Sequence, residues 1–549
     1  MTLQDLLRRF GPELAGAAAI ALACSLPAEA QCGLERFQTT TTDGNDQLGA
    51  AVSIDGSRMA VGAPRADLSE FSAQFEGQVT VFERVGDQWV ESATIDNPLG
   101  TSLDDFGVSV AFRGDLLAIG SPGADSDFVL DDGSVFVFEQ VNGAWVERER
   151  LTLPTPTGLD RFGEAVAWMG NRLVVGSPGN DLLGTDSGAV YVYEDVGGAL
   201  FPTAFLVPEV LSVGARYGSA LAADGDHIAI GGPLADATSP FAGRVEVQTF
   251  DGNVFSTFAS IPSPPLGIGS FFGSALALEG QRLLVGAPGV KPGVGATAGT
   301  AWVYDLADLT TPPAELAPIE LGAADNFGSA VALDGDVAWV GRPNAGPLGT
   351  ATGAIDRFER IGGAWVETAR LLPPTDSVRP GLGATLALAD GQLIVGAPEE
   401  AVGDFGFASF QTGAIYVYDL ATSLGGLTGC DEDVSLAAGG SFDLTARTGL
   451  PLALVVFLPG APGSTPLGPL TVPITLDATT NLALAGAYPI SSVLTPADAL
   501  GEARATVSLP LGLDPALAGT TFDHASVVID PSTLSVVGAD GPAPLTLVF

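Results

Sequence analysis

Basic residues are scarce in this sequence. Its 549 residues include 22 lysines and arginines against 64 aspartates and glutamates, which gives a net charge of −42 at pH 7. Lys291 is the only lysine. Because proteins bind nucleic acid by neutralising phosphates with lysine and arginine, this balance argues against a nucleic-acid partner. Anionic membrane surfaces should repel the chain for the same reason.

The residues that usually carry catalysis are also few. The two histidines, His227 and His524, have no nearby Cys, His or Glu in a ligand pattern, which argues against zinc sites and His-based triads. His227 follows a Gly-Asp turn, so we expect it to be a surface turn residue. No serine stands in a Gly-x-Ser-x-Gly motif at a strand-to-helix elbow. We therefore predict no catalytic residues and no enzyme activity.

Beyond the N-terminus, long apolar runs with helical character are missing, so no transmembrane span is expected. Residues 1–30 have the features of a secretory signal peptide. A weak basic region at Arg8 and Arg9 precedes an apolar run, Leu14–Leu26, that is too short to span a bilayer. Ala28-Glu29-Ala30 then fits a cleavage site. We expect a protein that is secreted or held at the cell surface.

Only three cysteines are present. Cleavage after residue 30 would remove Cys24 and leave Cys32 and Cys430, and an even pair in an exported protein predicts a disulfide. Lipidation at Cys24 is the alternative, although the residues before it fit a lipoprotein signal poorly.

Glycine and proline are abundant instead, with 72 and 39 residues, and many of them recur in one motif. "FGEAVAWMGNRLVVGSPGND" (162–181) has an apolar run after Phe-Gly, a polar turn, and a second run that ends in Gly-x-Pro. Seven copies are present, and their prolines stand 55 to 58 residues apart. These prolines are Pro64, Pro122, Pro178, Pro233, Pro288, Pro343 and Pro398. So steady a period indicates a repeat architecture and not a phosphate-binding loop.

Each repeat contains four segments that alternate with the period of a β-strand. In repeat three we predict strands at 163–168, 172–176, 189–194 and 200–206. Four antiparallel strands repeated seven times are typical of a seven-bladed β-propeller, in which each blade is stabilised by packing on its neighbours. The fold class is therefore all-β. We expect the repeat glycines to permit close backbone approach near the ring centre.

The Phe-Gly step and the Gly-Ala-Pro ends, as at 62–64, 286–288 and 396–398, resemble FG-GAP repeats, the units of the integrin α-subunit propeller. "GSVFVFEQVNGAWVE" (133–147) is similar to the third and fourth strands of the secreted bacterial variant. The resemblance covers residues 32–430, and it implies an integrin-α-like, protein-binding ring.

Repeat seven has a third strand at 414–419 but no fourth strand after it. Residues 34–40, "LERFQTT", stand before repeat one, where a fourth strand would be. We predict that they complete blade seven, which would bring Cys32 close to Cys430. A disulfide that closes so long a loop would stabilise the ring by about 5 kcal/mol in the chain-entropy model. The propeller would then span residues 31–430.

A different region, residues 431–549, follows the repeats. Short apolar runs at 453–458, 503–509, 525–529 and 545–549 alternate with Pro/Gly turns, which predicts a small β-sandwich. The segment 501–530 resembles a C-terminal module of secreted proteins from planctomycete-like bacteria. A final outer-membrane barrel strand at 545–549 is the alternative, but no series of amphipathic strands precedes it.

Two sets of repeated residues could be structural or functional. An aspartate precedes the Phe-Gly step by two residues at Asp46, Asp104, Asp160 and Asp325, where its carboxylate can bond to the turn backbone. Trp89, Trp145 and Trp365 begin the fourth strand, where packing between blades and sugar stacking are both conceivable. The repeat-locked positions favour the structural interpretation of both sets.

Calcium is the one metal for which the acidic loops offer a candidate site. The loop 123–133 carries Asp125, Asp127, Asp131 and Asp132, but it lacks the third alternating acid and the close glycine of a calcium loop. We expect a solvated acidic loop and predict no cofactor and no metal site.

Strand order places the long second-to-third loops and the fourth-to-first connections on one face, where ligands usually bind. The long loops of repeats seven, one, two and three carry Glu399, Glu400, Asp404, Asp67, Glu70, Glu76, Asp125, Asp127, Asp131, Asp132, Asp181 and Asp186. Those of repeats four to six carry only Asp236 and Lys291. We expect a nearly neutral arc there that suits a protein or glycan partner. The alternatives are a structural or anchoring envelope component and a hydrolase with an acidic site at the ring mouth.

Overall fold

The computed structural model describes most of the repeat region and the strands of the C-terminal region. The described residues are 34–37, 46–67, 75–86, 88–126, 129–236, 239–289, 297–318, 321–346, 352–373, 381–402, 410–420, 434–435, 440–447, 454–467, 470–475, 494–496, 502–509, 521–530, 535–539 and 543–548. Residues 35–373 and 377–418 belong to one compact unit, and residues 419–549 belong to another.

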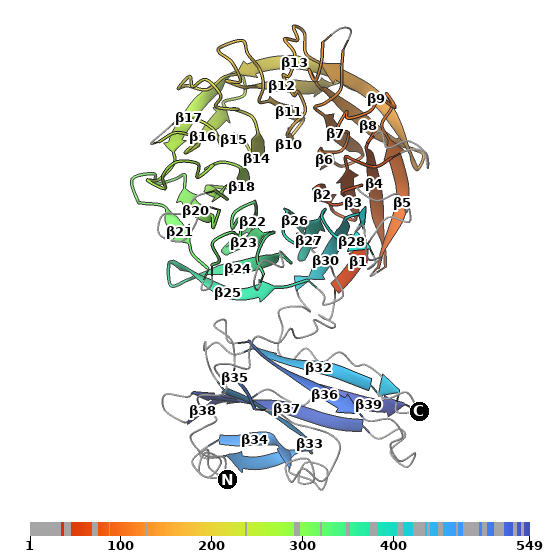
Figure 1. Cartoon of the computed structure of the whole chain (residues 1–549), viewed down its shortest axis with the longest axis vertical. Helices are drawn as coiled ribbons and strands as arrows, with labels where there is room; N and C mark the ends of the chain where they lie inside the picture. Colours follow the sequence, from red (N-terminus) through yellow and green to blue (C-terminus); the bar gives the residue numbers. More distant parts are fainter. Residues whose placement is uncertain are drawn as a thin grey trace. The chain divides into compact units, whose positions relative to one another are not determined.

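The repeats form seven antiparallel four-stranded sheets around a ring, as predicted (Figure 1). Within each of the first six blades the strands are neighbours in chain order. Blades one to three are β2 (Ala51–Asp55), β3 (Arg58–Ala63), β4 (Gln78–Val85), β5 (Gln88–Asp96); β6 (Ser109–Arg113), β7 (Leu116–Ser121), β8 (Ser134–Val141), β9 (Ala144–Thr152); β10 (Val166–Met169), β11 (Arg172–Ser177), β12 (Ala189–Val196) and β13 (Ala199–Leu206). Blades four to six are β14 (Ala220–Asp224), β15 (His227–Gly232), β16 (Arg244–Phe250), β17 (Phe255–Pro262); β18 (Ala275–Glu279), β19 (Arg282–Ala287), β20 (Thr300–Asp305), β21 (Ala314–Leu316); β22 (Ala330–Asp334), β23 (Val337–Arg342), β24 (Ala354–Ile361) and β25 (Ala364–Leu371).

The Phe-Gly step is a tight turn and not part of the first strand. In repeat three the Glu164 N–H donates to the Arg161 carbonyl oxygen at 3.2 Å. Gly163 between them has a φ of 95°, and the other six Phe-Gly glycines have φ between 91° and 94°. A positive φ at the third residue defines a type II turn and favours glycine. β10 therefore begins at Val166, after the predicted start at Gly163, whereas the other three strands of this blade lie close to their predicted limits.

The same glycine allows neighbouring blades to touch through their backbones. The glycine near the end of each second strand faces the carbonyl oxygen of the Phe-Gly glycine in the next blade. A Cβ on Gly62 would lie 1.9 Å from the Gly107 oxygen, and one on Gly176 would lie 2.0 Å from the Gly218 oxygen. At the closing junction, a Cβ on Gly396 would lie 2.1 Å from the oxygen of Gly49. The predicted close approach of the repeat glycines is confirmed at all seven junctions.

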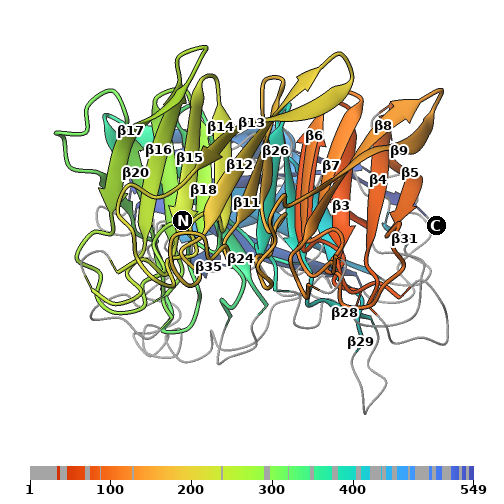
Figure 2. The ribbon, with the colours of Figure 1, turned by 90° about the horizontal axis from the view of Figure 1, so that it is seen from above.

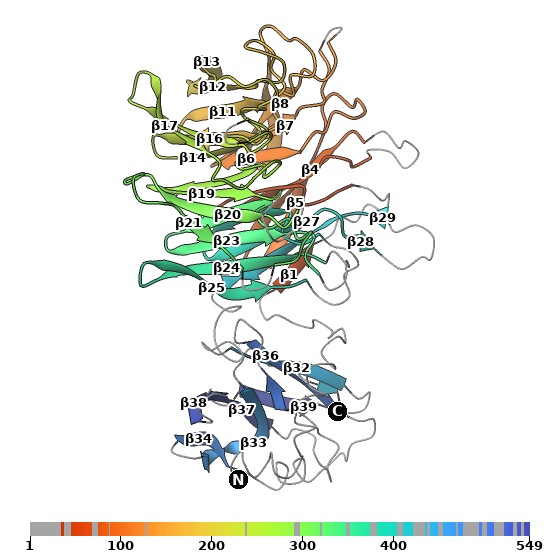
Figure 3. The same ribbon diagram turned by 60° about the vertical axis from the view of Figure 1, so that its left-hand side comes forward.

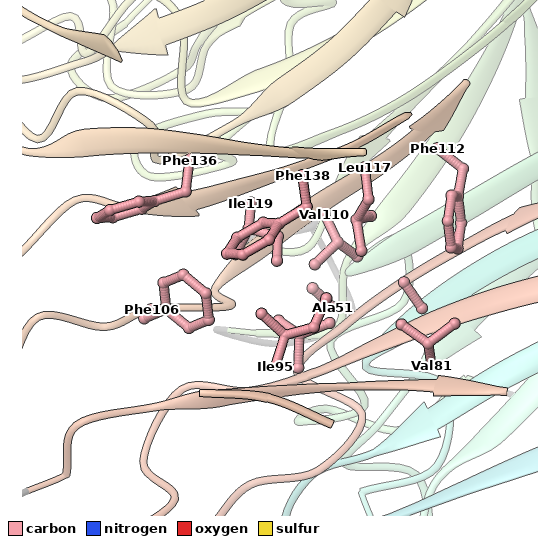
Figure 4. Packing of buried hydrophobic residues seen from close by; sticks show 12 residues of the cluster. Ala51, Val81, Ile95, Phe106, Val110, Phe112, Leu117, Ile119, Phe136 and Phe138 are labelled. Atoms are coloured by element: carbon pink, nitrogen blue, oxygen red, sulfur yellow. The ribbon is translucent and has the colours of Figure 1, made fainter. Parts of the chain in front are cut away.

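Large apolar side chains fill the space between blades. Phe106 and Phe136 are buried, with ring centroids 5.6 Å apart in an edge-on arrangement. Val81 and Ile95 of blade one pack with them and with Leu117 of blade two (Figure 4). Burying one such side chain is worth about 1.5–3 kcal/mol relative to leaving it in water. The cores therefore lie between sheets, and each blade is stabilised by its neighbours.

The N-terminal strand closes the ring, as predicted. Blade seven consists of β26 (Thr385–Ala389), β27 (Gln392–Ala397), β30 (Ala414–Asp419) and, as its outer strand, β1 (Leu34–Phe37). Cys32 and Cys430 lie outside the described residues, as do Cys24 and the predicted signal segment 1–30. The disulfide therefore stays a prediction.

Nine strands are described in the C-terminal region. They are β31 (Val434–Ser435), β32 (Gly440–Arg447), β33 (Leu454–Leu467), β34 (Leu470–Thr475), β35 (Leu494–Pro496), β36 (Glu502–Leu509), β37 (Thr521–Asp530), β38 (Ser535–Ala539) and β39 (Ala543–Val548). β33 and β37 pair antiparallel, and β32 pairs with β36. The four apolar runs predicted as strands lie largely in β33, β36, β37 and β39. Among the described residues of the whole chain, no helix has the length and hydropathy to cross a bilayer.

Candidate partner-binding face

The two ends of the blades differ as the strand order predicts. Short hairpin turns join first to second strands, and third to fourth strands in blades one to four and six, at the upper edge in Figure 2, whereas the longer loops leave the lower edge. In Figure 3 the loop that carries β28 (Ala401–Val402) and β29 (Phe410–Gln411) projects on the same side as the other long loops. We call this side the loop face and the opposite side the hairpin face.

The hairpin face is used for contacts between blades. The Asp55 carboxylate accepts the Gly114 N–H of the next blade at 2.6 Å, and Arg58 donates to Asp115 at 2.7 Å. The Glu279 carboxylate accepts the Gly335 N–H at 2.7 Å in the same way. These polar groups of the hairpin face are therefore engaged with the turns of neighbouring blades.

On the loop face, four repeats have an aspartate three residues after the proline of the Gly-x-Pro step. The carboxylate of this aspartate bonds to the backbone of the long loop and fixes its fold. In repeat three the Asp181 carboxylate accepts the Asp186 N–H at 2.7 Å, and Asp186 has a φ of 48°. Such a bond holds a left-handed residue that would otherwise be unfavourable. The corresponding bonds are Asp67 to Phe75, Asp125 to Asp131 and Asp236 to Phe241, at 2.7, 2.8 and 3.0 Å. Our sequence analysis missed this role, although the proline-to-aspartate spacing is readable in the sequence.

In blades two to four, the long loop is also joined to the connection that follows its blade. The Leu159 N–H donates to the Leu130 carbonyl oxygen at 2.8 Å, and the Gly214 N–H donates to the Thr185 carbonyl oxygen at 2.8 Å. In the next repeat the Gly269 N–H donates to the Pro240 oxygen at 3.1 Å. In blades two to four, the described part of the long loop and the connection after the blade are therefore held side by side. We call each such pair of joined segments a ledge.

The aspartates before the Phe-Gly step have the structural role that the sequence favours. Asp160 is buried and accepts from the Thr157 N–H at 2.5 Å and from the Asn180 amide at 3.1 Å. Burial raises the pKa of this carboxyl above its usual value, against the hydrogen bonds that lower it. Asp104 accepts from Asn97 at 2.7 Å and also from Thr101. The Asp325 carboxylate accepts the Gly322 N–H at 2.7 Å.

The acidic arc is less exposed than its sequence suggests. Glu76, Asp132 and Glu400 are buried, which corrects the expectation that they belong to an exposed acidic arc formed by the long loops of repeats seven, one, two and three. Glu400 forms an ion pair with Arg36 and accepts the Tyr416 hydroxyl at 2.6 Å, so it joins the N-terminal strand to blade seven. Glu70, Asp127 and Asp404 lie outside the described residues, as do 290–296 and 347–351 of the neutral arc. The neutral arc stays a prediction.

In the acidic loop 123–133, two of the described carboxylates bind the backbone of their own loop. The carboxylates of Asp125 and Asp132 accept the N–H groups of Asp131 and Ser126 at 2.8 and 2.7 Å, so both bind their own loop. The other Asp132 oxygen is buried without a hydrogen-bond partner among the described residues. No group of three His, Cys, Asp or Glu side chains converges anywhere in the described part of the chain. Asp127 lies outside the described residues, so the expected absence of a calcium site stays a prediction.

The three tryptophans pack between blades. Trp89 is buried, and its indole N–H donates to Gln392 of blade seven at 3.1 Å. Trp145 packs against the core between blades one and two. The guanidinium of Arg282, in blade five, lies 6.0 Å from the ring centroid of Trp365, in blade six. The structural interpretation is confirmed.

The expectation for His227 was wrong in part. It is the first residue of β15 and half-buried, with its ring 5.2 Å from that of Phe258. Its Nδ1 atom is buried without a hydrogen-bond partner among the described residues. The side chain is held against blade four because β15 begins directly at the turn. The side chain of His524, in β37, is not among those described.

Two buried acids on third strands also escaped the sequence analysis. Glu246 pairs in register with Ile230, and Asp356 pairs with Val340, so both occupy the same repeat position. Asp356 lies between Arg342 at 2.9 Å and Arg370 at 2.8 Å. Both carboxylates are buried within a blade and do not belong to a surface site.

The perturbed groups near the loop face are buried and structural. Burial and the nearby Asp160 raise the pKa of Tyr191 to about 12, so its hydroxyl stays protonated. Burial, together with Glu246, raises the pKa of the Tyr217 hydroxyl well above its usual range. Neither phenol is suited to serve as a base or a nucleophile at neutral pH. The arrangement can present side chains to a partner and offers no assembled pair for acid–base chemistry among the described residues.

Comparison with known proteins agrees with this architecture. Residues 89–138 and 145–193 match the FG-GAP repeat family. The chain contains FG-GAP repeats. It is also similar to Integrin alpha-2 of Mus musculus, with 32% identity over 164 residues, which cover 28% of this chain and 13% of the relative. Integrin alpha-2 of Bos taurus is 31% identical over 159 residues, 26% of this chain and 13% of the relative.

The aligned length is thus a small fraction of these curated relatives. The FG-GAP match itself runs from the fourth strand of blade one into the third strand of blade three. The seven-bladed FG-GAP propeller and its homology to integrin alpha together explain the repeated Phe-Gly and Gly-x-Pro steps.

Proposed function

We propose that this FG-GAP propeller is a non-catalytic recognition or adhesion protein, secreted or held at the cell surface. It binds a protein or glycan partner through its loop face. The observation that carries the proposal is the set of ledges in blades two to four, where backbone bonds fix adjacent loops on a rigid ring. The homology to integrin alpha supports the same role.

The rest of the chain fits an exported protein. We propose that residues 1–30 are a signal peptide, that residues 31–430 form the propeller, and that Cys32 and Cys430 form a disulfide. We also propose that residues 431–549 form a β-sandwich module, which the pairing of β33 with β37 and of β32 with β36 supports.

The function is tested by blocking one face at a time. Thr185 and Val196 are exposed and belong to opposite faces of blade three. Each is replaced separately (Thr185→Cys, Val196→Cys) and coupled to polyethylene glycol. The full chain is then assayed on a glycan array and with a phage-displayed library of random peptides.

We expect the polymer at position 185 to abolish binding and the polymer at 196 to leave it unchanged. The native chain, treated with the same reagent, controls for modification of its own cysteines. Equal loss from both positions, or the absence of any binding by the native chain, would contradict the proposal.

A further inference from the structure

Exposed apolar side chains gather on the ledges of blades two to four. Six of them are between 44% and 73% exposed, although their side chains are large and aliphatic or aromatic. We call this set the apolar crest; its members are Leu130, Leu159, Leu183, Val213, Phe241 and Ile268. Exposed apolar residues scattered singly are ordinary, whereas these residues lie in pairs on joined loop segments of successive blades, a grouping typical of an interaction surface.

The crest is built as three pairs, one in each blade. The Leu159 N–H donates to the Leu130 carbonyl oxygen at 2.8 Å, so these leucines belong to joined segments. A Cβ on Gly184, the neighbour of Leu183, would lie 3.5 Å from a methyl carbon of Val213. The Phe271 N–H, three residues after Ile268, donates to the Phe241 carbonyl oxygen at 3.3 Å. Each pair therefore takes one residue from a long loop and one from the connection beside it.

Acidic side chains stand among these apolar ones. Asp125, Asp181 and Asp236 are exposed on the same three loops, and Glu209 is exposed on the connection between blades three and four. The basic residues nearby are Arg216, which is exposed, and Arg161, which is half-buried and paired with Glu164 at 2.7 Å. Each of the three aspartates accepts a backbone N–H of its own loop. The apolar crest is therefore bordered by exposed acidic side chains. We call Asp125, Asp181, Asp236 and Glu209 the acidic surround.

We infer that the apolar crest binds a polypeptide segment whose apolar side chains are flanked by lysine or arginine. This inference rests on the proposed function and specifies its partner. Such a segment would bury the crest while its cations meet the acidic surround, as in interfaces with an apolar centre and a polar rim. It also assigns binding to blades two to four, so that blade four is the one member of the neutral arc expected from the sequence that takes part.

Other occupants fit less well. Sugars stack on aromatic rings, but Phe241 is the single aromatic residue of the crest. A second copy would bring the same acidic surround against itself, and the whole chain carries a net charge of −42. An anionic membrane would be repelled by that charge.

The test uses a phage-displayed library of random dodecapeptides selected on the intact full chain. The crest variant carries Leu130→Ser, Val213→Ser and Phe241→Ser. The matched control carries Val141→Ser, Val196→Ser and Val254→Ser, which are exposed valines at hairpins of the same blades. We expect selected peptides to combine apolar residues with Lys or Arg, and the crest variant to bind them at least about tenfold more weakly than the control does.

A charge variant, Asp125→Asn, Asp181→Asn and Asp236→Asn, keeps a side-chain oxygen for each loop bond and removes three charges. We expect it to bind the same peptides several-fold more weakly and with a smaller dependence on salt. Unchanged unfolding midpoints of all variants show that the fold is intact.

Peptides that bind the crest variant and the control equally would overturn the inference while leaving the proposed function standing. Selection of acidic or uncharged peptides would also overturn it. Crest-dependent retention on phosphatidylcholine vesicles would assign the surface to lipid, and crest-dependent dimerisation in sedimentation would assign it to a second copy; either result overturns it. Failure of the native chain to select any peptide while it binds a glycan array would reject the polypeptide partner but not the proposed function.

Discussion

The carbonyl oxygen of Gly163 lies where a side chain on Gly120 would begin: a Cβ there would be 2.0 Å from it. Gly120 belongs to blade two and Gly163 to the turn that opens blade three. Since equivalent contacts occur at every junction, the diameter of the ring is fixed by backbone touching backbone.

We therefore expect Gly120→Ala to destabilise the propeller strongly. The new methyl group would meet main chain, which cannot move without displacing a whole blade, so the cost should reach or exceed about 3 kcal/mol. The midpoint of chemical unfolding, followed by tryptophan fluorescence, measures it. Gly143→Ala is the control, because a Cβ there meets nothing within 4 Å and only the positive φ of 83° opposes it. Equal losses in both variants would show that blade contact does not limit this site.

The ion pair between Arg36 and Glu400 provides a second prediction. Glu400 is fully buried, and its partner lies on β1, so the pair holds the closing strand to blade seven. Removing one member of a buried pair costs about 3–5 kcal/mol because the other charge is left uncompensated. We expect Glu400→Gln to lower the unfolding midpoint and to speed proteolytic cleavage near β1.

The double variant Arg36→Met, Glu400→Gln separates this electrostatic cost from lost packing. It should be more stable than Glu400→Gln alone, since no unpaired charge remains. Arg36→Met is also measured alone. If the losses of stability in Arg36→Met and Glu400→Gln add up to the loss in the double variant, the two residues are not coupled.

Much of this fold could be predicted from the sequence because each repeat has glycine and proline at fixed positions and apolar residues that alternate with a period of two. The closure by residues 34–37 followed from one missing strand in repeat seven. The start of β10 was missed because Phe162-Gly163 also fits the alternation, although its φ makes it a turn. Glu400 looked like a surface acid because its partner is 364 residues away, and pairing at that separation is not visible in local pattern.

The loop aspartates give a third prediction, which concerns local order. Asp181→Ala removes the acceptor of the Asp186 N–H, a bond worth about 1 kcal/mol. Because Asp186 holds a left-handed backbone, we expect its amide and its neighbours to exchange hydrogen faster, with little change in global stability. Hydrogen–deuterium exchange by mass spectrometry measures this. Asp226→Ala, an exposed aspartate on the hairpin face, should leave exchange in this loop unchanged.

Glu246 and Asp356 occupy the same repeat position, yet we expect neutralising them to have opposite effects. Burial raises the pKa of Glu246 above its usual 4.5, so the folded state holds this proton more tightly than the unfolded state does. Stability should therefore fall as pH rises through 4.5 toward the raised value. Glu246→Gln should remove that fall and stabilise the protein at pH 7, while still accepting the Glu209 N–H that Glu246 accepts at 2.8 Å.

Asp356→Asn should instead destabilise, because Arg342 and Arg370 would lose the carboxylate between them. The loss should stay below the about 3–5 kcal/mol of a fully uncompensated buried charge, since Arg342 keeps Asp325 and Arg370 keeps Glu367 as partners. Urea unfolding of both variants at a series of pH values compares the two sites directly. Stabilisation by both substitutions would show that the arginines do not compensate Asp356. Destabilisation by both at pH 7 would show that Glu246 is compensated in the folded state, contrary to the direction of its pKa shift.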